Sequence, residues 1–376
     1  MPKELGKLAL LESLYLHENQ LVSTPTLPFL TALTNCSHLQ KIDLSNNPLG
    51  GILPVSIAQL SRNLTLLDLS NTSIHGSIPH EIGNLTSLTY LALADNLLSG
   101  RIPPELGMLQ RLERLRLRNN KLQGSIPTEI SQLRKLGSMS IHQNMLSGPI
   151  PHSFGDLKQL RRLLLSENQL SGTIPAALGN CWRLELLDLS WNRLTGSIPR
   201  EVASFSNLQF YFKSPEISKM AMVQTIDISF NLLTGVIPAA LGSCKGLVKL
   251  NLSHNALKGS IPDTFGELKN LEKIDLSSNN LSGAIPMSLG KLRMLHTLNF
   301  SFNNLREEIP KEGIFENIAS NSLMGNPGLC GQQIYLPLCP PSASPKQRNH
   351  SVFKNVIIPV AGVSTFVICC LLIGLL

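Results

Sequence analysis

Hydrophobic residues recur along this chain with a fixed period. The pattern is L-x-L-x-x-N-x-L, in which apolar residues alternate with exposed positions and an asparagine follows. Successive copies lie 24 residues apart from Thr72 to Asn192 and again from Asn231 to Asn303. A sustained period of this length predicts a solenoid, because one such unit cannot bury its apolar face alone and must stack on its neighbours.

Each part of the repeat has a physical interpretation. The alternation L-x-L predicts a short strand with one face inward, and stacked repeats place these strands side by side in a parallel sheet. The asparagine amide can bond backbone groups that the turn leaves unpaired. Thr72 takes the asparagine position once, and the other copies have Asn19, Asn47, Asn96, Asn120, Asn144, Asn168, Asn192, Asn231, Asn255, Asn279 and Asn303.

The second half of each repeat reads L-x-G-x-I-P, as in residues 98–107, 170–179 and 281–290. This half-repeat resembles the plant-specific class of leucine-rich repeats found in receptor-like kinases, receptor-like proteins and polygalacturonase inhibitors. Residues 29–40 (FLTALTNCSHLQ) and 309–331 (IPKEGIFENIASNSLMGNPGLCG), followed by LPLC at 336–339, resemble the receptor kinases that sense microbial patterns. The resemblance covers the whole chain. It implies an α/β repeat fold, a curved solenoid with a parallel β-sheet on its concave face.

The chain divides into four predicted parts. Residues 1–308 form the solenoid of about 13 coils, 309–341 the C-terminal cap, 342–355 a polar juxtamembrane linker, and 356–376 a transmembrane helix. The last part has 21 residues without a charge, and a helix of that length is about 30 Å long, the thickness of a bilayer core.

One interval departs from the period. Asn192 and Asn231 are 39 residues apart, nine short of two repeats. We therefore expect a truncated coil near 208–219, appearing as a local bulge, a break in the sheet or a distorted coil. After Asn303 the repeat pattern stops, and the open end of the solenoid requires a cap.

Five of the seven cysteines fall into two groups, and the other two, Cys369 and Cys370, lie in the predicted transmembrane helix. Cys330 and Cys339 close a short loop in the cap, where a disulfide would contribute about 2–3 kcal/mol in a secreted domain; the alternative is two free thiols. Cys36, Cys181 and Cys244 each lie 11 residues before their repeat asparagine, so they occupy one structural position in different coils. We interpret these three as buried free thiols, because coils that far apart are beyond disulfide reach.

Composition excludes several functions. The net charge is +7, but the chain has no run of five basic residues, so nucleic acid is not an expected partner. No C-x-x-C pair indicates a metal site, and no Walker, G-x-S-x-G, H-E-x-x-H or kinase motif is present. The chain is therefore not expected to be an enzyme or to bind a cofactor.

Function is expected on the exposed strand positions, which lie six, four, two and one residues before each asparagine. Many of these positions carry a generic D-x-S that serves the scaffold, so residues that differ from it are the candidates for function. The residues that differ form one predicted ligand-binding patch on the concave face: Tyr90, Asp95, Arg114, Arg116, Arg118, Ser138, Ser140, His142, Gln143, Arg162, Ser166, Glu167 and Trp191.

Three arginines on one strand repel one another unless an anion lies between them, and arginine forks suit carboxylates. The hypothesis is a peptide ligand with an acidic side chain or C-terminal carboxylate near Arg116, and with Trp191 as an apolar anchor. The alternative is a solvated basic stripe without a ligand.

Eight N-x-S/T sequons are compatible with a glycosylated outer surface. Two of them, Asn251 and Asn299, lie within predicted strands, where a glycan would be blocked. The eight are Asn35, Asn63, Asn71, Asn84, Asn251, Asn280, Asn299 and Asn349.

These features predict a plasma-membrane receptor with extracellular repeats, a peptide or protein ligand, a leucine-rich-repeat co-receptor kinase as a further partner, and a role in defence or developmental signalling. Met1 falls inside a repeat, no signal peptide precedes it, and no kinase follows Leu376. A tail-anchored orientation with cytosolic repeats therefore stays open. So do two other interpretations: an incompletely represented active serine/threonine receptor kinase, and an extracellular protein like the polygalacturonase inhibitors.

Overall fold

A computed structural model describes residues 1–203, 223–333 and 336–340 of the chain. The chain separates into two compact units, Met1–Cys339 and Pro340–Leu376. All secondary structure described below belongs to the first unit.

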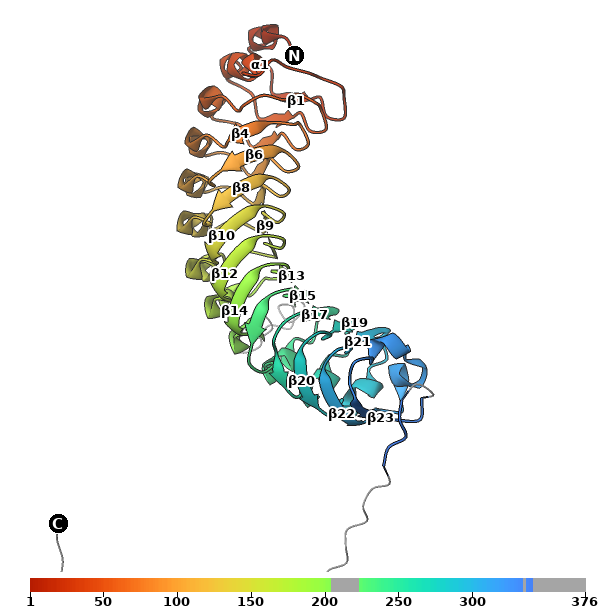
Figure 1. The fold of residues 1–376 in the computed structure, drawn as a ribbon. Coiled ribbons are helices and arrows are strands. Elements are labelled where there is room, and N and C mark those ends of the chain that lie inside the picture. The colour runs from red at the N-terminus through yellow and green to blue at the C-terminus, as the bar shows by residue number, and fades with distance from the viewer. Residues whose placement is uncertain (204–222, 334–335, 341–376) are drawn as a thin grey trace, which may run out of the picture. The chain divides into compact units, whose positions relative to one another are not determined.

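The main sheet of this unit has 12 parallel strands, one from each coil, in sequence order. Apolar residues lie opposite one another in the register, as where Leu115 pairs with Met139 and Met139 with Leu163. The strands are β1 (Ser13–Tyr15), β2 (Lys41–Asp43), β3 (Leu66–Asp68), β5 (Tyr90–Ala92), β7 (Arg114–Arg116), β9 (Ser138–Ser140), β11 (Arg162–Leu164), β13 (Leu186–Asp188), β15 (Thr225–Asp227), β17 (Lys249–Asn251), β19 (Lys273–Asp275) and β21 (Thr297–Asn299). Figure 1 shows labelled members of this ladder stacked in that order.

A second ladder follows the asparagine turn in most coils and consists of a seven-stranded and a four-stranded sheet. The first contains β4 (His75–Ser77), β6 (Leu97–Gly100), β8 (Lys121–Gly124), β10 (Met145–Pro149), β12 (Gln169–Thr173), β14 (Arg193–Ser197) and β16 (Leu232–Thr234). The second contains β18 (Lys258–Gly259), β20 (Asn280–Gly283), β22 (Asn304–Glu308) and β23 (Gly328–Cys330). The parallel-sheet solenoid predicted from the repeat is confirmed.

Short 3-10 helices follow the I-P dipeptides and form a row along one edge of the unit in Figure 1. The glycine after each helix's apolar residue permits close stacking: a Cβ on Gly155 would lie 2.4 Å from the carbonyl oxygen of Ala177 in the next coil. The interval between Asn19 and Asn47, which is 28 residues long, instead contains a one-turn α-helix, α1 (Pro28–Ala32). The 3-10 helices span 3–7, 33–35, 55–59, 80–84, 104–108, 128–132, 152–156, 176–180, 239–243, 263–267, 287–291, 313–317 and 320–322.

The interior combines aliphatic packing with the asparagine ladder. Asn144 is 9% exposed, and its amide nitrogen donates to the carbonyl oxygens of Ile141 and His142 in its own turn and of Leu117 in the preceding coil. Its oxygen accepts from the backbone nitrogen of Leu122 at 3.0 Å. One side chain therefore satisfies a turn and links it to the neighbouring coil.

The ladder extends one coil beyond the predicted pattern. Asn326 donates to the carbonyl oxygens of Phe300 and Leu323 and accepts from the backbone nitrogen of Leu305. The expectation that the pattern stops after Asn303 is therefore corrected, because Asn326 carries the same bonds into the cap.

The strands that precede Asn192 and Asn231, at the two ends of the 39-residue interval, pair directly with each other. Leu186 in β13 pairs with Thr225 in β15, and Leu187 with Ile226, so the sheet has no break between these two strands. The connection contains 15 residues more than the 24 that separate Arg162 from its partner Leu186. The truncated coil predicted near 208–219 lies outside the described residues.

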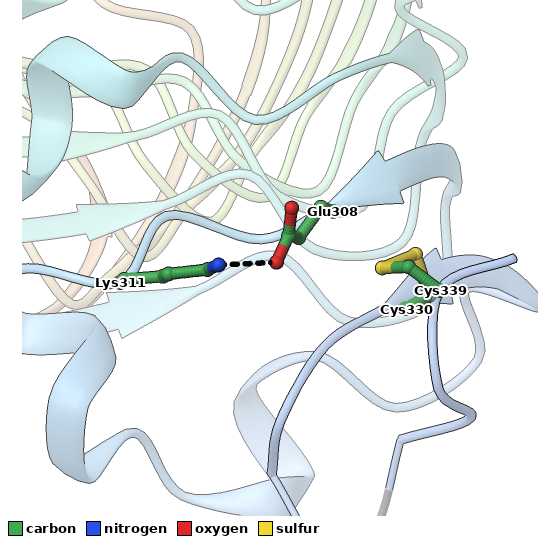
Figure 2. The surroundings of a disulfide bond; sticks show 4 residues. All are labelled: Glu308, Lys311, Cys330 and Cys339. Carbon is green, nitrogen blue, oxygen red and sulfur yellow. Dashed lines mark ion pairs between the residues drawn. A yellow bond between two sulfur atoms is a disulfide. The ribbon is translucent and has the colours of Figure 1, made fainter. Parts of the chain in front are cut away.

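A disulfide joins Cys330 to Cys339 in the cap. Figure 2 shows this disulfide near the ion pair of Glu308 and Lys311. Cys36, Cys181 and Cys244 are buried and free. Burial raises the pKa of the Cys181 thiol to about 11 and that of Cys244 to about 12.

The predicted membrane-spanning segment, residues 356–376, lies outside the described residues. Within the ranges that the structure describes, no helix has the length and hydrophobicity needed to cross a bilayer.

Replacing Asn144 by alanine should lower the free energy of unfolding by about 2–3 kcal/mol, because it leaves buried backbone groups unpaired in two adjacent coils. Asn144→Thr should cost less, since the natural Thr72 hydroxyl donates to the carbonyl of Leu69 in the same structural position. Urea unfolding monitored by circular dichroism measures both. Equal losses for alanine and threonine would contradict a hydrogen-bonding role.

Candidate ligand-binding surface

The exposed face of the main sheet carries a regular polar lattice. In the D-x-S motif, the carboxylate of Asp188 accepts from the backbone nitrogen and the hydroxyl of Ser190, at 3.1 and 2.7 Å. Asp43, Asp227 and Asp275 make the same pair of bonds to the serine two residues later. The motif stiffens the strand end and leaves little free hydrogen-bonding capacity on the face.

Four consecutive strands lack this lattice. At the aspartate position, β5, β7, β9 and β11 carry Ala92, Arg116, Ser140 and Leu164. At this position Ala92 and Ser140 are buried, and Arg116 is an exposed polar side chain that the lattice does not use.

A hollow of about 590 Å³ lies on this part of the face, next to the beginnings of β7, β9, β11 and β13. We call it the basic hollow. Six cationic side chains and two carboxylates line it, together with Gly137, Ser138 and Gln159: the cations are Arg114, Arg116, Lys135, Arg161, Arg162 and Arg183, and the carboxylates Glu113 and Glu185.

Only part of this positive charge is neutralised within the basic hollow. Arg161 forms an ion pair with Glu185 at 3.3 Å, and Arg183 donates to the side-chain oxygen of Gln159 at 2.7 Å. Gly137 provides space, because an added Cβ there would lie 3.7 Å from its nearest neighbours, the carbonyl oxygens of Gln159 and Glu113. An anionic group of a few atoms fits this charge and volume.

Arg116 has a second contact at the edge of the basic hollow. Its guanidinium lies over the ring of Tyr90, 5.5 Å from the centroid, and the Tyr90 hydroxyl donates to Asp68 at 3.2 Å. Burial raises the pKa of Tyr90 above its usual value, with Asp68 adding to the shift. Tyr90 therefore stays neutral and helps hold Arg116 in place.

Arg118 does not join the other two arginines. It forms an ion pair with Asp95 at 2.9 Å, and Asn119 donates to the same carboxylate. The expectation that Arg114, Arg116 and Arg118 together lack a counter-charge is corrected, because one of the three already has an acidic partner in the preceding coil.

The remaining predicted residues are engaged in pairs between strands or coils. Gln143 donates to Glu167 at 3.2 Å, and the Ser166 hydroxyl donates to Asp188 at 2.8 Å. The hydroxyl of Ser140 lies 3.1 Å from Nδ1 of His142. Burial lowers the pKa of His142, and the nearby Arg118 lowers it further. Both effects favour the neutral imidazole.

Trp191 lies apart from the basic hollow, in an aromatic stack. Its ring packs on Phe230 with centroids 3.7 Å apart, and Phe230 packs on His254 at 4.0 Å. Trp191 is 54% exposed, so one large apolar surface stays accessible to solvent.

The repeat pattern did not predict Lys135, Arg161 and Arg183 in the basic hollow, nor Phe230 and His254 in the stack. The first three lie seven or nine residues before their asparagine, outside the exposed strand positions where function is expected. Phe230 and His254 do occupy the position just before the asparagine, so comparing that position across coils would have found them.

Family models for leucine-rich repeats match three segments of the chain. The model described as leucine-rich repeat region matches residues 62–210, and two models described as leucine-rich repeat match 221–281 and 38–60.

Curated relatives are plant receptor kinases. The chain is 47% identical over 85 residues to receptor kinase-like protein Xa21 of Oryza sativa subsp. japonica, which is 22% of this chain and 8% of that protein. It is 52% identical over 66 residues to the receptor-like serine/threonine-protein kinase EFR of Arabidopsis thaliana, 18% of this chain and 6% of EFR. The matched segments thus span less than a tenth of these relatives.

Solved structures resemble a larger part of the chain. The plant peptide hormone receptor RGFR1, in complex with RGF2, has a TM-score of 0.76 and 38% identity, over 89% of this chain and 49% of that one. The Arabidopsis HAESA ectodomain with an IDA peptide has a TM-score of 0.74 and 32% identity, over 89% and 57%. The Leptospira interrogans leucine-rich-repeat protein LIC12759 has a TM-score of 0.64 and 32% identity, over 83% and 75%. Together with the repeat lattice, these matches show that the chain belongs to the leucine-rich-repeat protein family.

Proposed function

We propose that this chain is the ligand-binding region of a plant receptor, and that it takes a peptide or protein ligand across the main sheet between β5 and β13. The basic hollow carries this proposal, because three of the four strands that bound it, β7, β9 and β11, lack the scaffold lattice. The missing lattice and the excess of positive charge together favour a binding role over a solvated basic stripe.

The chemistry of the basic hollow favours an acidic group on the ligand. Arg114 and Arg116 project from one strand into a space next to Ser138 and Arg162. Arginine forks bind carboxylates with two parallel hydrogen bonds, and partial enclosure strengthens such bonds. An acidic side chain or a C-terminal carboxylate near Arg116 is the ligand feature that we propose.

Several finer parts of the proposal rest on the plant relatives. We place the repeats outside the plasma membrane, with residues 356–376 as the single span, and we include a leucine-rich-repeat co-receptor kinase as a partner. Similar structures include RGFR1 in complex with RGF2, HAESA with an IDA peptide, and HAESA with IDA and the co-receptor SERK1. We propose a role in defence or developmental signalling: residues 29–40 and 309–331 resemble the receptor kinases that sense microbial patterns, and two similar structures are of receptors with peptide hormones.

Arg114→Ala combined with Arg116→Ala should weaken ligand binding about 100-fold, since each substitution removes charged hydrogen bonds. Ligands are selected from a library of synthetic peptides with free C-termini, and affinities are measured by calorimetry. The selected peptides should contain an acidic residue or require the free carboxylate.

The matched control is Lys249→Ala with Lys273→Ala. These exposed lysines occupy the same strand position in β17 and β19, outside the basic hollow, so the double variant removes equal charge. Equal loss of affinity in both double variants would reject a specific site, since net charge alone would then explain the binding.

Gly137→Leu tests the basic hollow without removing a charge. The leucine side chain would occupy the space above Gly137 and should reduce affinity at least as much as one arginine substitution. Gly137→Ala should bind normally, because its Cβ meets nothing within 3.7 Å. Normal binding by the leucine variant would place the ligand elsewhere on the chain.

The proposed extracellular location also predicts which sequons carry glycans. Asn251 and Asn299 replace aspartate in the D-x-S motif, and their amides donate to Asp227 and Asp275, so both should stay unmodified. Peptide mass spectrometry of the protein secreted from plant cells should find glycans on the exposed Asn35, Asn63, Asn84 and Asn280. Glycan occupancy at Asn251 equal to that at the exposed sequons would contradict the prediction that its hydrogen-bonded amide stays unmodified. The remaining two differ: Asn71 is exposed but donates to Asn46, and Asn349 lies outside the described residues.

A further inference from the structure

The residue just before each ladder asparagine forms a row that we call the turn row. Its members have φ between 50° and 56° in all 12 coils, so every coil points this side chain in the same direction. Several neighbouring members form hydrogen bonds with each other: Asn71 donates to Asn46, Asn119 to Asp95, and Gln143 to Glu167. The row therefore brings side chains of adjacent coils into direct contact.

Four of the last five members of the turn row are aromatic. Trp191, Phe230 and His254 stack with interplanar angles of 11° and 14°. Their centroid separations of 3.7 and 4.0 Å are smaller than the strand spacing of about 4.8 Å, so the rings converge at the surface. Each coil here contributes one ring at van der Waals distance from the next.

One position interrupts this stack. Ser278 follows His254 in the row, and Phe302 follows Ser278. His254 is exposed and Phe302 is 53% exposed, although both are large rings. On its far side Phe302 lies against Gly325, where a Cβ would come within 2.6 Å of Cδ1, so this ring is supported by the cap.

The interruption spans one coil. His254 and Phe302 are two coils apart, which separates their backbones by about 10 Å. Trp191 and His254 are also two coils apart and enclose the ring of Phe230, with centroid separations of 3.7 and 4.0 Å. The same convergence of His254 and Phe302 would leave room for one ring. The serine side chain at the base is too short to fill this space.

We propose that His254, Ser278 and Phe302 form a slot for one aromatic side chain, a tryptophan or tyrosine, of a protein partner. The inserted ring continues the stack of Trp191 and Phe230, and Ser278 offers a hydroxyl to the indole N–H or the phenol. Aromatic residues are the commonest anchors of protein interfaces because they bury a large area and carry a polar handle.

The residues next to the slot in sequence do not project into it. Ser253, Ser277 and Ser301 are small and at most 4% exposed, and their hydroxyls donate to Asn251, Asp275 and Asn299. Beyond them Asp275 already accepts from Ser277 and Asn299, so it does not offer a free carboxylate to a cation. This favours an uncharged ring over a guanidinium group.

The test uses the full chain with ¹³C-labelled histidine, and N-acetyl-tryptophanamide as the probe. The His254 ring signals, assigned from a His254→Gln spectrum, should shift upfield and saturate with the probe, whereas N-acetyl-leucinamide should cause no shift. Phe302→Leu should weaken probe binding about tenfold, because it removes one wall of the slot. Ser278→Trp should abolish the shift by filling the slot from within, and Ser278→Ala, which leaves it open, should retain binding.

Absence of a saturable His254 shift in the wild type would overturn the proposal. So would a shift caused by N-acetyl-argininamide but not by the tryptophan probe, or one that persists unchanged in both Ser278→Trp and Phe302→Leu. The slot lies outside the basic hollow, so its failure leaves the proposed peptide site untouched.

Discussion

The asparagine ladder is the interaction on which the rest of this structure depends. A coil that turns sharply leaves buried carbonyls and an N–H without partners, and water cannot reach them. One amide per coil satisfies these groups and bonds to the preceding coil as well, as Asn144 does with Leu117 and Leu122. Because the amide fixes the turn, it also fixes the strand before it and the left-handed residue beside it.

This constraint separates scaffold from function. Positions that face inward are set by the ladder and by leucine packing, whereas the exposed strand positions are free to vary. Most coils fill them with the D-x-S lattice, which bonds to itself. Between β5 and β11 that lattice is absent, and the side chains placed there concentrate positive charge around Gly137. The turn row varies in the same manner, polar at first and largely aromatic in its last five members.

The period made the fold and the strand positions predictable, because repeated leucines and asparagines admit one arrangement. It could not predict that Thr225–Asp227 pairs directly with β13, since spacing alone does not choose between two candidate strands in a 39-residue interval. Asn326 was not predicted as a member of the ladder, because the cap retains the asparagine but not the full leucine pattern of the repeat. The partnership of Arg118 with Asp95 and the stacking of Trp191 on Phe230 depend on contacts between coils, which a single repeat does not specify.

The most direct test of this account is a photo-crosslinking map of a bound peptide ligand. A peptide selected on the intact protein would carry a benzophenone at each position in turn, and the labelled residues would be identified by mass spectrometry. The account predicts labels on β5, β7, β9, β11 and β13, with the acidic end of the peptide closest to Gly137 and Arg116. Labels concentrated on the 3-10 helices, or on the D-x-S strands β17 to β21, would contradict it.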